Sequence, residues 1–179
     1  FGTDIFPKLI RNARAFAHAF LGRDGSTAPY WRDIGTLRAY WQAHMDLVGP
    51  MPSFELDDTT WPIGTAATPP RTISGATATA RGGMIEDSIV GAGCAVTGQV
   101  RHSVLFDGVE IGRGATVVDS VVLPGARIGA GSRLRGVIVD AGFCVPEGAV
   151  LERAAARTEP LVLSCPDARD DTVRYARAG

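Results

Sequence analysis

The sequence predicts a mainly β fold in which short parallel strands wind into a solenoid. Residues 103–119 ("SVLFDGVEIGRGATVVD") and 120–136 ("SVVLPGARIGAGSRLRG") are adjacent copies of one repeat and align without a gap. Within a copy, apolar residues recur about every six positions, as at Leu105, Ile111 and Val117. Internal repetition of this kind is typical of a solenoid, in which each repeat buries its apolar face only against its neighbours.

The repeated positions form columns, in which each member lies one repeat length after the previous one. The apolar columns are Val104, Val121 and Ile138; Ile111, Ile128 and Val145; and Val117, Leu134 and Leu151, and glycine columns are Gly108, Gly125 and Gly142, and Gly114, Gly131 and Gly148. A slightly shorter copy at 88–102 matches the same columns, and a weaker one is expected near Ile73. We expect at least four coils between Ser88 and Glu152, with the apolar columns inside and glycines in turn conformations that are costly for other residues.

Before the repeats, the pattern predicts one strand and one helix. "AFAHAF" alternates so that Phe16, His18 and Phe20 share one face, which is typical of a strand. Thr36 is suited to cap a helix that extends to Leu47. The apolar stripe of this helix comprises Leu37, Tyr40, Trp41, His44 and Leu47, and we interpret His44 as a packed histidine rather than a catalytic base.

Five of the 11 prolines fall between residues 49 and 72, which indicates an extended connection. We therefore expect residues 1–48 to be the end of an α/β domain and residues 49–72 to be a linker. The solenoid is expected over residues 73–155, followed by a C-terminal tail at 156–179.

Composition excludes several classes of partner. The formal charge of −1 provides no basic surface for nucleic acid or an anionic membrane. The three cysteines form no disulfide or zinc pattern, and we interpret Cys94 and Cys144 as small core residues within coils. No apolar run of the ~20 residues needed to span a membrane and no signal peptide is present, so we expect a reducing cytoplasm.

Several segments together resemble the last third of bacterial glucose-1-phosphate adenylyltransferases (ADP-glucose pyrophosphorylases). They are "FGTDIFPKL", "YWRDIGTLRAYWQAHMDL", "WPIGT" and the repeat region from "GGMIEDSIVGAGCAVTG" onwards. The most specific piece is residues 30–36. Gly64 stands where the family usually has an arginine, and the tail after Leu151 matches only loosely.

The resemblance implies a left-handed parallel β-helix of hexapeptide repeats, preceded by the α/β end of a nucleotidyltransferase domain. It implies an intact cytoplasmic enzyme that makes ADP-glucose and diphosphate from ATP and glucose 1-phosphate for glycogen synthesis. That enzyme would require Mg²⁺ and form an allosteric homotetramer that binds phosphorylated metabolites. The family's N-terminal sheet, with its triphosphate loop, is missing from this sequence, so we expect the 179 residues alone to be inactive.

The same resemblance assigns candidate site residues near the expected helix. Asp33 occupies the place of a family Mg²⁺ ligand, and a carboxylate suits a hard cation that holds a triphosphate. The alternative is that Asp33 has only a structural role, as a capping residue or as an ion-pair partner of Arg32 or Arg38. Tyr30 and Trp31 are candidates for lining the sugar-phosphate pocket or for relaying the effector signal, and packing at a domain seam is the alternative for both.

Arginines on the repeats are candidates for effector binding. Arg101 and Arg135 share a column with Val118 between them, so strand spacing of ~4.8 Å per coil places their backbones roughly 9–10 Å apart. Two guanidinium groups there could hold a phosphorylated effector, or both could be solvated. Arg157 lies near the family's anion-binding arginines.

Two other functions stay open. In a hexapeptide-repeat acyltransferase, a histidine at a coil edge deprotonates the acceptor that attacks an acyl-CoA, and His102 is the one histidine in the repeats. The other alternative is a catalytically inactive regulatory subunit.

Overall fold

The computed structural model describes residues 2–21, 29–53, 56, 70–154 and 158–164 of the chain. The chain divides into two compact units, Phe1–Trp31 and Arg32–Gly179. The first contains α1 (Ile5–Asn12), which the sequence patterns did not predict. The expected strand at residues 15–20 is wrong: these residues are irregular and exposed. A strand needs a partner for its backbone hydrogen bonds, and none of the described residues pairs with this segment.

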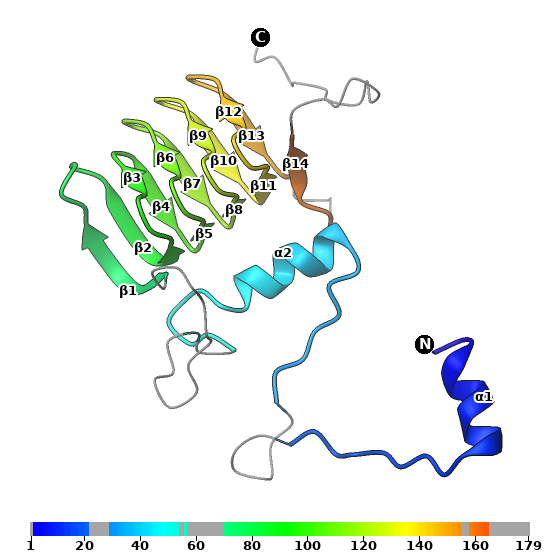
Figure 1. The fold of residues 1–179 in the computed structure, drawn as a ribbon. Helices are drawn as coiled ribbons and strands as arrows, with labels where there is room; N and C mark the ends of the chain where they lie inside the picture. Colours follow the sequence, from blue (N-terminus) through cyan, green and yellow to red (C-terminus); the bar gives the residue numbers. More distant parts are fainter. Residues whose placement is uncertain (1, 22–28, 54–55, 57–69, 155–157, 165–179) are drawn as a thin grey trace. The chain divides into compact units, whose positions relative to one another are not determined.

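The described residues of the second unit form one helix and 14 strands (Figure 1). They are α2 (Leu37–Met45), β1 (Arg71–Ala78), β2 (Met84–Val90), β3 (Ala95–Val96), β4 (Gln99–Arg101), β5 (Val104–Leu105), β6 (Glu110–Ile111), β7 (Thr116–Val118), β8 (Val121–Val122), β9 (Arg127–Ile128), β10 (Arg133–Arg135), β11 (Val137–Val139), β12 (Cys144–Val145), β13 (Val150–Glu152) and β14 (Leu161–Leu163). The mainly β solenoid predicted from the repeats is confirmed.

Parallel ladders stack equivalent strands of successive coils. One ladder runs β3-β6-β9-β12, a second runs β4-β7-β10-β13, and a third runs β5-β8-β11-β14, with the longer β2 pairing with both β4 and β5. The register follows the sequence columns, with Val117 opposite both Val100 and Leu134. The three ladders form the sides of a coil that repeats about four times, as expected.

The weaker copy expected near Ile73 is not a coil. β1 pairs with β2 antiparallel, with a register irregularity between Ile73 and Ala76. The chain reverses direction just before β2, where Gly82 has a φ of +82° and the N–H of Gly82 donates to the carbonyl oxygen of Thr79. A reversal this tight produces a hairpin, whereas a parallel coil needs a longer crossover.

Inside the coil, two of the predicted apolar columns form the core. Ile111, Ile128 and Val145 are buried in the central cluster together with the column of Val117. The corresponding prediction for Cys144 is wrong, since this residue is exposed while the neighbouring Val145 points inward. Cys94 is half-buried and packs against the cluster, as expected.

The column of Val104, Val121 and Ile138 is buried outside the coil, which corrects the expectation that it fills the interior. Successive side chains of a strand point to opposite faces. Leu105, next to Val104, belongs to the central cluster, whereas Val104 packs in a second cluster with Ile89 and Val48. The strands β5, β8 and β11 are therefore apolar on both faces.

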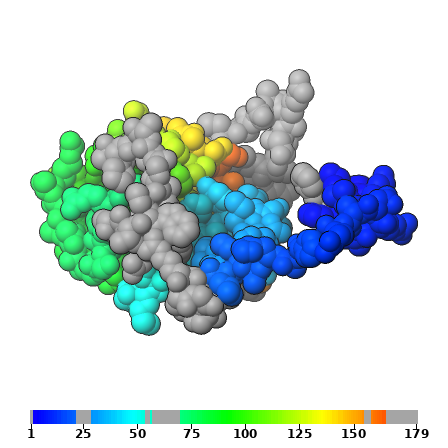
Figure 2. Space-filling model, turned by 60° about the horizontal axis from the view of Figure 1, so that its bottom comes forward, coloured from blue at the N-terminus to red at the C-terminus, as the bar shows by residue number. Residues whose placement is uncertain are grey.

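Helix α2 covers this outer face. The Thr36 hydroxyl accepts a hydrogen bond from the N–H of Ala39 at 3.1 Å, so the predicted cap is confirmed. Met45 and Leu47 pack against the cluster of Val104, and Figure 2 shows the light-blue surface of α2 continuous with the coils. Leu37 was expected on the buried stripe, but it is 55% exposed because the contacts come from the later turns of the helix.

A ladder of buried serines joins neighbouring coils at one corner. The N–H of Ser103 donates to Ser88 Oγ at 3.1 Å, and the Ser103 hydroxyl donates to the carbonyl oxygen of Arg101. Ser120 repeats both bonds one coil later. Each hydroxyl therefore satisfies a buried N–H of the next coil, which would otherwise cost about 1–3 kcal/mol.

The two faces of β5 lead to a prediction about neighbouring residues. Leu105→Asp should lower the free energy of unfolding of the solenoid by at least about 4 kcal/mol, because it buries an unpaired charge inside the coil. Val104→Asp should leave the coils folded and release α2. Thermal melts by circular dichroism and hydrogen exchange of the α2 amides measure the two effects. Equal unfolding by both variants would show that Val104 belongs to the central core.

Candidate functional site at the solenoid corner and the helix seam

The corner that carries the serine ladder also carries three residues with an unusual backbone. Asp87, His102 and Asp119 have φ values of +45°, +47° and +49°. Gly136 occupies the same place in the next coil with a φ of +64°. A non-glycine residue in this region costs about 1–3 kcal/mol, a cost that contacts of its side chain must offset.

The side chains at this corner form a charged cluster. His102 Nδ1 lies 2.9 Å from Asp119 Oδ1, and Arg135 Nε lies 3.5 Å from Asp119 Oδ2. Both carboxylate oxygens of Asp119 therefore have a cationic or hydrogen-bonding neighbour. Gly49 packs against the imidazole, since a Cβ built at Gly49 would lie 3.7 Å from His102 Nε2.

The same corner anchors α2. The indole N–H of Trp41 donates to the carbonyl oxygen of Asp119 at 2.8 Å. The guanidinium of Arg153 lies 4.8 Å from the centre of the Trp41 ring, a cation–π distance. His44, also on α2, packs 4.4 Å from the ring of Tyr40 and 5.9 Å from that of Phe106, measured between ring centres. Partial burial raises the pKa of Tyr40 above its ordinary value.

Arg101 and Arg135 lie in one column, as predicted, because both pair with Val118 in the ladder. The ladder also places Glu86 beside Arg101 and Glu152 beside Arg135. The two arginines are exposed and lie on either side of Val118, each with an acidic neighbour on its other side. Arg157, the third effector candidate, lies outside the described residues.

Asp33 is an exposed residue in the turn before α2. Its Oδ1 accepts a hydrogen bond from the N–H of Gly35 at 3.0 Å. Arg32, a possible partner of Asp33, forms an ion pair with Asp46 at 2.5 Å instead. Within the described parts of the chain, Oδ2 of Asp33 has no partner, and no group of three or more His, Cys, Asp or Glu residues could hold a metal.

Tyr30 and Trp31 belong to the first unit, whereas Asp33 belongs to the second. Tyr30 is half-buried, and Trp31 is 75% exposed.

Sequence reasoning missed Trp41, Asp119 and Arg153 as parts of a common cluster. One signal was present: Asp87, His102 and Asp119 each precede a serine of the repeated column. The contact of Arg153 with Trp41 joins residues far apart in the sequence, and no repeat could have revealed it.

Comparisons with known proteins bear on this arrangement. A family model described as the GlmU-like C-terminal hexapeptide matches residues 69–157. The chain is 37% identical to a glucose-1-phosphate adenylyltransferase of Methylococcus capsulatus, over 99% of this chain and 44% of the relative. It is 42% identical to that of Shewanella amazonensis, over 84% of this chain and 36% of the relative. The chain is homologous to the C-terminal part of bacterial glucose-1-phosphate adenylyltransferases.

The chain spans less than half the length of these family members and corresponds to their C-terminal part. The glucose-1-phosphate adenylyltransferase of Bradyrhizobium diazoefficiens shows the same relation, with 40% identity over 84% of this chain and 37% of the relative. None of the helices within the described residues is long and apolar enough to cross a membrane.

The contacts of Trp41 lead to a prediction about the seam, by which we mean the contact surface between α2 and the coils. Trp41→Phe should lower the free energy of unfolding by about 1–2 kcal/mol, because the bond to Asp119 is lost and the cation–π contact weakens. Urea unfolding measures this difference. Trp31→Phe, at an exposed position, is the control and should change stability by less than about 0.5 kcal/mol. Equal effects from the two substitutions would contradict an anchoring role for Trp41.

Proposed function

We propose that this chain is the C-terminal regulatory and assembly part of a glucose-1-phosphate adenylyltransferase. The single observation that supports it most is identity of 37–42% to enzymes of that name, over 84–99% of this chain. The complete enzyme would form ADP-glucose and diphosphate from ATP and glucose 1-phosphate, as a homotetramer in the cytoplasm. Residues 1–48 would be the end of its catalytic domain, 49–72 a linker, 73–155 the β-helix and 156–179 a tail.

Within that enzyme we assign Asp33 a role as one ligand of Mg²⁺. Its carboxylate is exposed, and the bond from the N–H of Gly35 orients one oxygen and leaves the other open to a cation. Bound Mg²⁺ would offset the negative charge of the triphosphate during adenylyl transfer. Among the residues that the structure describes, no group of three or more His, Cys, Asp or Glu residues could hold a metal, so the remaining ligands would come from other parts of the complete enzyme. For this reason we expect the chain alone to be inactive.

The seam between α2 and the coils connects Asp33 to the solenoid. Asp33 lies just before the capped start of α2, and Trp41 and Met45 of that helix contact the coils. A change in the position of α2 on the coils would therefore be carried to Asp33 through a short, capped helix. We propose that regulation of the enzyme acts through this seam.

The proposed effector residues are Arg101, Arg135 and Arg157, with phosphorylated metabolites as ligands. Arg135 supports this role because it contacts Asp119, whose carbonyl oxygen accepts the bond from Trp41. A phosphate on Arg135 would compete with Asp119 for the guanidinium and so act next to the α2 anchor. Tyr30 and Trp31 remain candidates for the sugar-phosphate pocket.

The acyltransferase alternative has one observation in its favour, the pairing of His102 with Asp119. An imidazole oriented by a carboxylate is a common form of general base. However, Gly49 packs beside Nε2, the nitrogen that would have to reach an acceptor. Saturable binding of acetyl-CoA to this chain would favour the alternative over our proposal. An inactive regulatory subunit would retain the effector response without turnover.

The metal role of Asp33 is tested in the full-length enzyme. Asp33→Asn removes a charge with little change in volume, so the fold should survive while turnover falls about tenfold or more and the Mg²⁺ requirement rises. Asp140→Asn is the control, since Asp140 is likewise exposed and accepts a backbone N–H bond, at 2.8 Å from Ala141. Steady-state kinetics over a Mg²⁺ series measure both. Near-normal turnover and Mg²⁺ dependence of Asp33→Asn would show that the carboxylate is structural.

The effector role of the arginine column is tested in the same enzyme. Arg101→Gln and Arg135→Gln should each raise the half-saturating concentration of an activating sugar phosphate about tenfold, because a charge-assisted hydrogen bond is lost. Arg127→Gln is the control on another face of the coil, where Arg127 lies 3.7 Å from Glu110. An unchanged response in both variants would place the effector elsewhere.

A further inference from the structure

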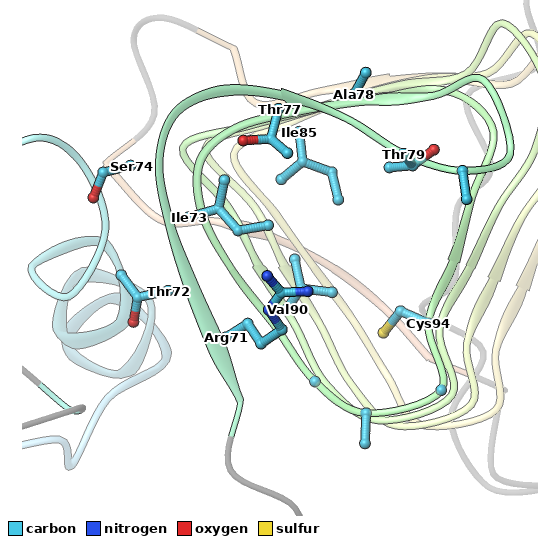
Figure 3. A pocket seen from close by; sticks show the side chains of 14 residues that line it. Arg71, Thr72, Ile73, Ser74, Thr77, Ala78, Thr79, Ile85, Val90 and Cys94 are labelled. Carbon is cyan, nitrogen blue, oxygen red and sulfur yellow. The ribbon is translucent and has the colours of Figure 1, made fainter. Parts of the chain in front are cut away.

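The N-terminal end of the solenoid is an open cavity rather than a closed core. Its volume is about 560 Å³, within the usual range for small-molecule sites. Strand β1 and the first coil form its walls, as Figure 3 shows in a view along the coils. Because no further coil of described residues stacks before the first one, the inward-facing side chains of this end lack the neighbour that covers each later coil.

The cavity has an apolar interior. Ile73, Ile85 and Val90 line it, together with the half-buried Cys94. The Cys94 thiol donates to the carbonyl oxygen of Phe106 at 3.0 Å, and burial raises its pKa. The remaining lining residues are small or carry hydroxyl groups, apart from one arginine, and none of the lining residues carries a negative charge.

One positive charge lies at the mouth of this apolar space, on the exposed residue Arg71. Figure 3 shows the side chain of Arg71, at the start of β1, over the opening of the cavity, and Arg71 pairs with Val90 across the β1–β2 hairpin. Among the described residues, no carboxylate pairs with this guanidinium and no acceptor hydrogen bonds to it. An arginine is always charged near neutral pH, so an anion whose apolar part enters the cavity would gain a charged hydrogen-bonding partner at the rim.

We propose that the cavity at the N-terminal end of the solenoid, called here the mouth, binds a small amphipathic organic anion. The apolar body of the ligand packs on Ile73, Ile85 and Val90, and its carboxylate or sulfonate group pairs with Arg71. This assignment follows from charge complementarity: an apolar segment from a second copy of the chain would cover Arg71 and leave its charge unpaired. It does not depend on the proposed adenylyltransferase function.

The first test uses 8-anilinonaphthalene-1-sulfonate, which has an aromatic body and one sulfonate, as the probe. Titration into the 179-residue chain should give saturable fluorescence with one site, and decanoate should compete for that site. Arg71→Gln should weaken the affinity about tenfold, which corresponds to the loss of ~1.4 kcal/mol. Arg133→Gln, an exposed arginine remote from the lining residues, is the charge-matched control and should leave the affinity unchanged.

The second test locates the ligand through Cys94. In a chain with Cys144→Ser and Cys165→Ser, alkylation of Cys94 by iodoacetamide should slow at least fivefold when decanoate saturates the site. Unchanged alkylation would show that decanoate binds elsewhere and would overturn the assignment. Equal weakening by Arg71→Gln and Arg133→Gln, or no saturable binding, would also overturn it. Protection of Cys94 that increases with protein concentration, without ligand, would show that a second copy covers the mouth instead.

Discussion

Parallel pairing between successive coils is the constraint on which the rest of this structure depends. The ladders hold equivalent residues of neighbouring coils in register, so a side chain that recurs once in every repeat becomes part of a continuous column. A column has one environment along its length, which is why a single polar residue in an apolar column would be costly. The same register brings Ser88, Ser103 and Ser120 close enough to form the hydrogen-bonded ladder.

The register also explains how a helix outside the repeats joins the solenoid. Because β5, β8 and β11 carry apolar side chains on both faces, the coil presents a flat apolar surface to the outside as well as a filled interior. Helix α2 covers this surface through its later turns and is held by the bond from Trp41 to Asp119. The turn with Asp33 lies just before this helix, so the candidate metal ligand is positioned by packing on the coils.

The repeats predicted most of the fold, because a period in the sequence reports directly on a period in space. The same reasoning failed where periodicity stops. Ile73 resembles a repeat position, but the chain turns at Gly82, so β1 pairs with β2 in the antiparallel direction instead of forming a coil. The column of Val104 is apolar because α2, from a distant, earlier part of the sequence, covers it. The alternation of apolar residues alone cannot distinguish burial inside the coil from burial under a helix. Arg101 and Arg135 could be nominated from their shared repeat column, whereas Asp33 and Arg157 could be nominated only through the family resemblance.

The corner residues show how a repeated backbone acquires individual contacts. The backbone adopts a positive φ at this corner in successive coils, and glycine would satisfy it at the lowest cost. Asp87 instead accepts a hydrogen bond from the N–H of Gly75 and so holds β1. His102 contacts the turn at Gly49, and Asp119 accepts the hydrogen bond from Trp41 of α2. In the next coil the corner residue is Gly136, and a Cβ there would lie 3.0 Å from the Cβ of Arg153.

That space at Gly136 lets Arg153 cross the corner to the Trp41 ring. The corner position of each coil therefore makes, or makes room for, a different contact with the segments outside the coils. Together these contacts join β1, the Gly49 turn and α2 to a solenoid that is otherwise regular. The contacts that are not repeated from coil to coil therefore lie at the corner, where the side chain differs between coils.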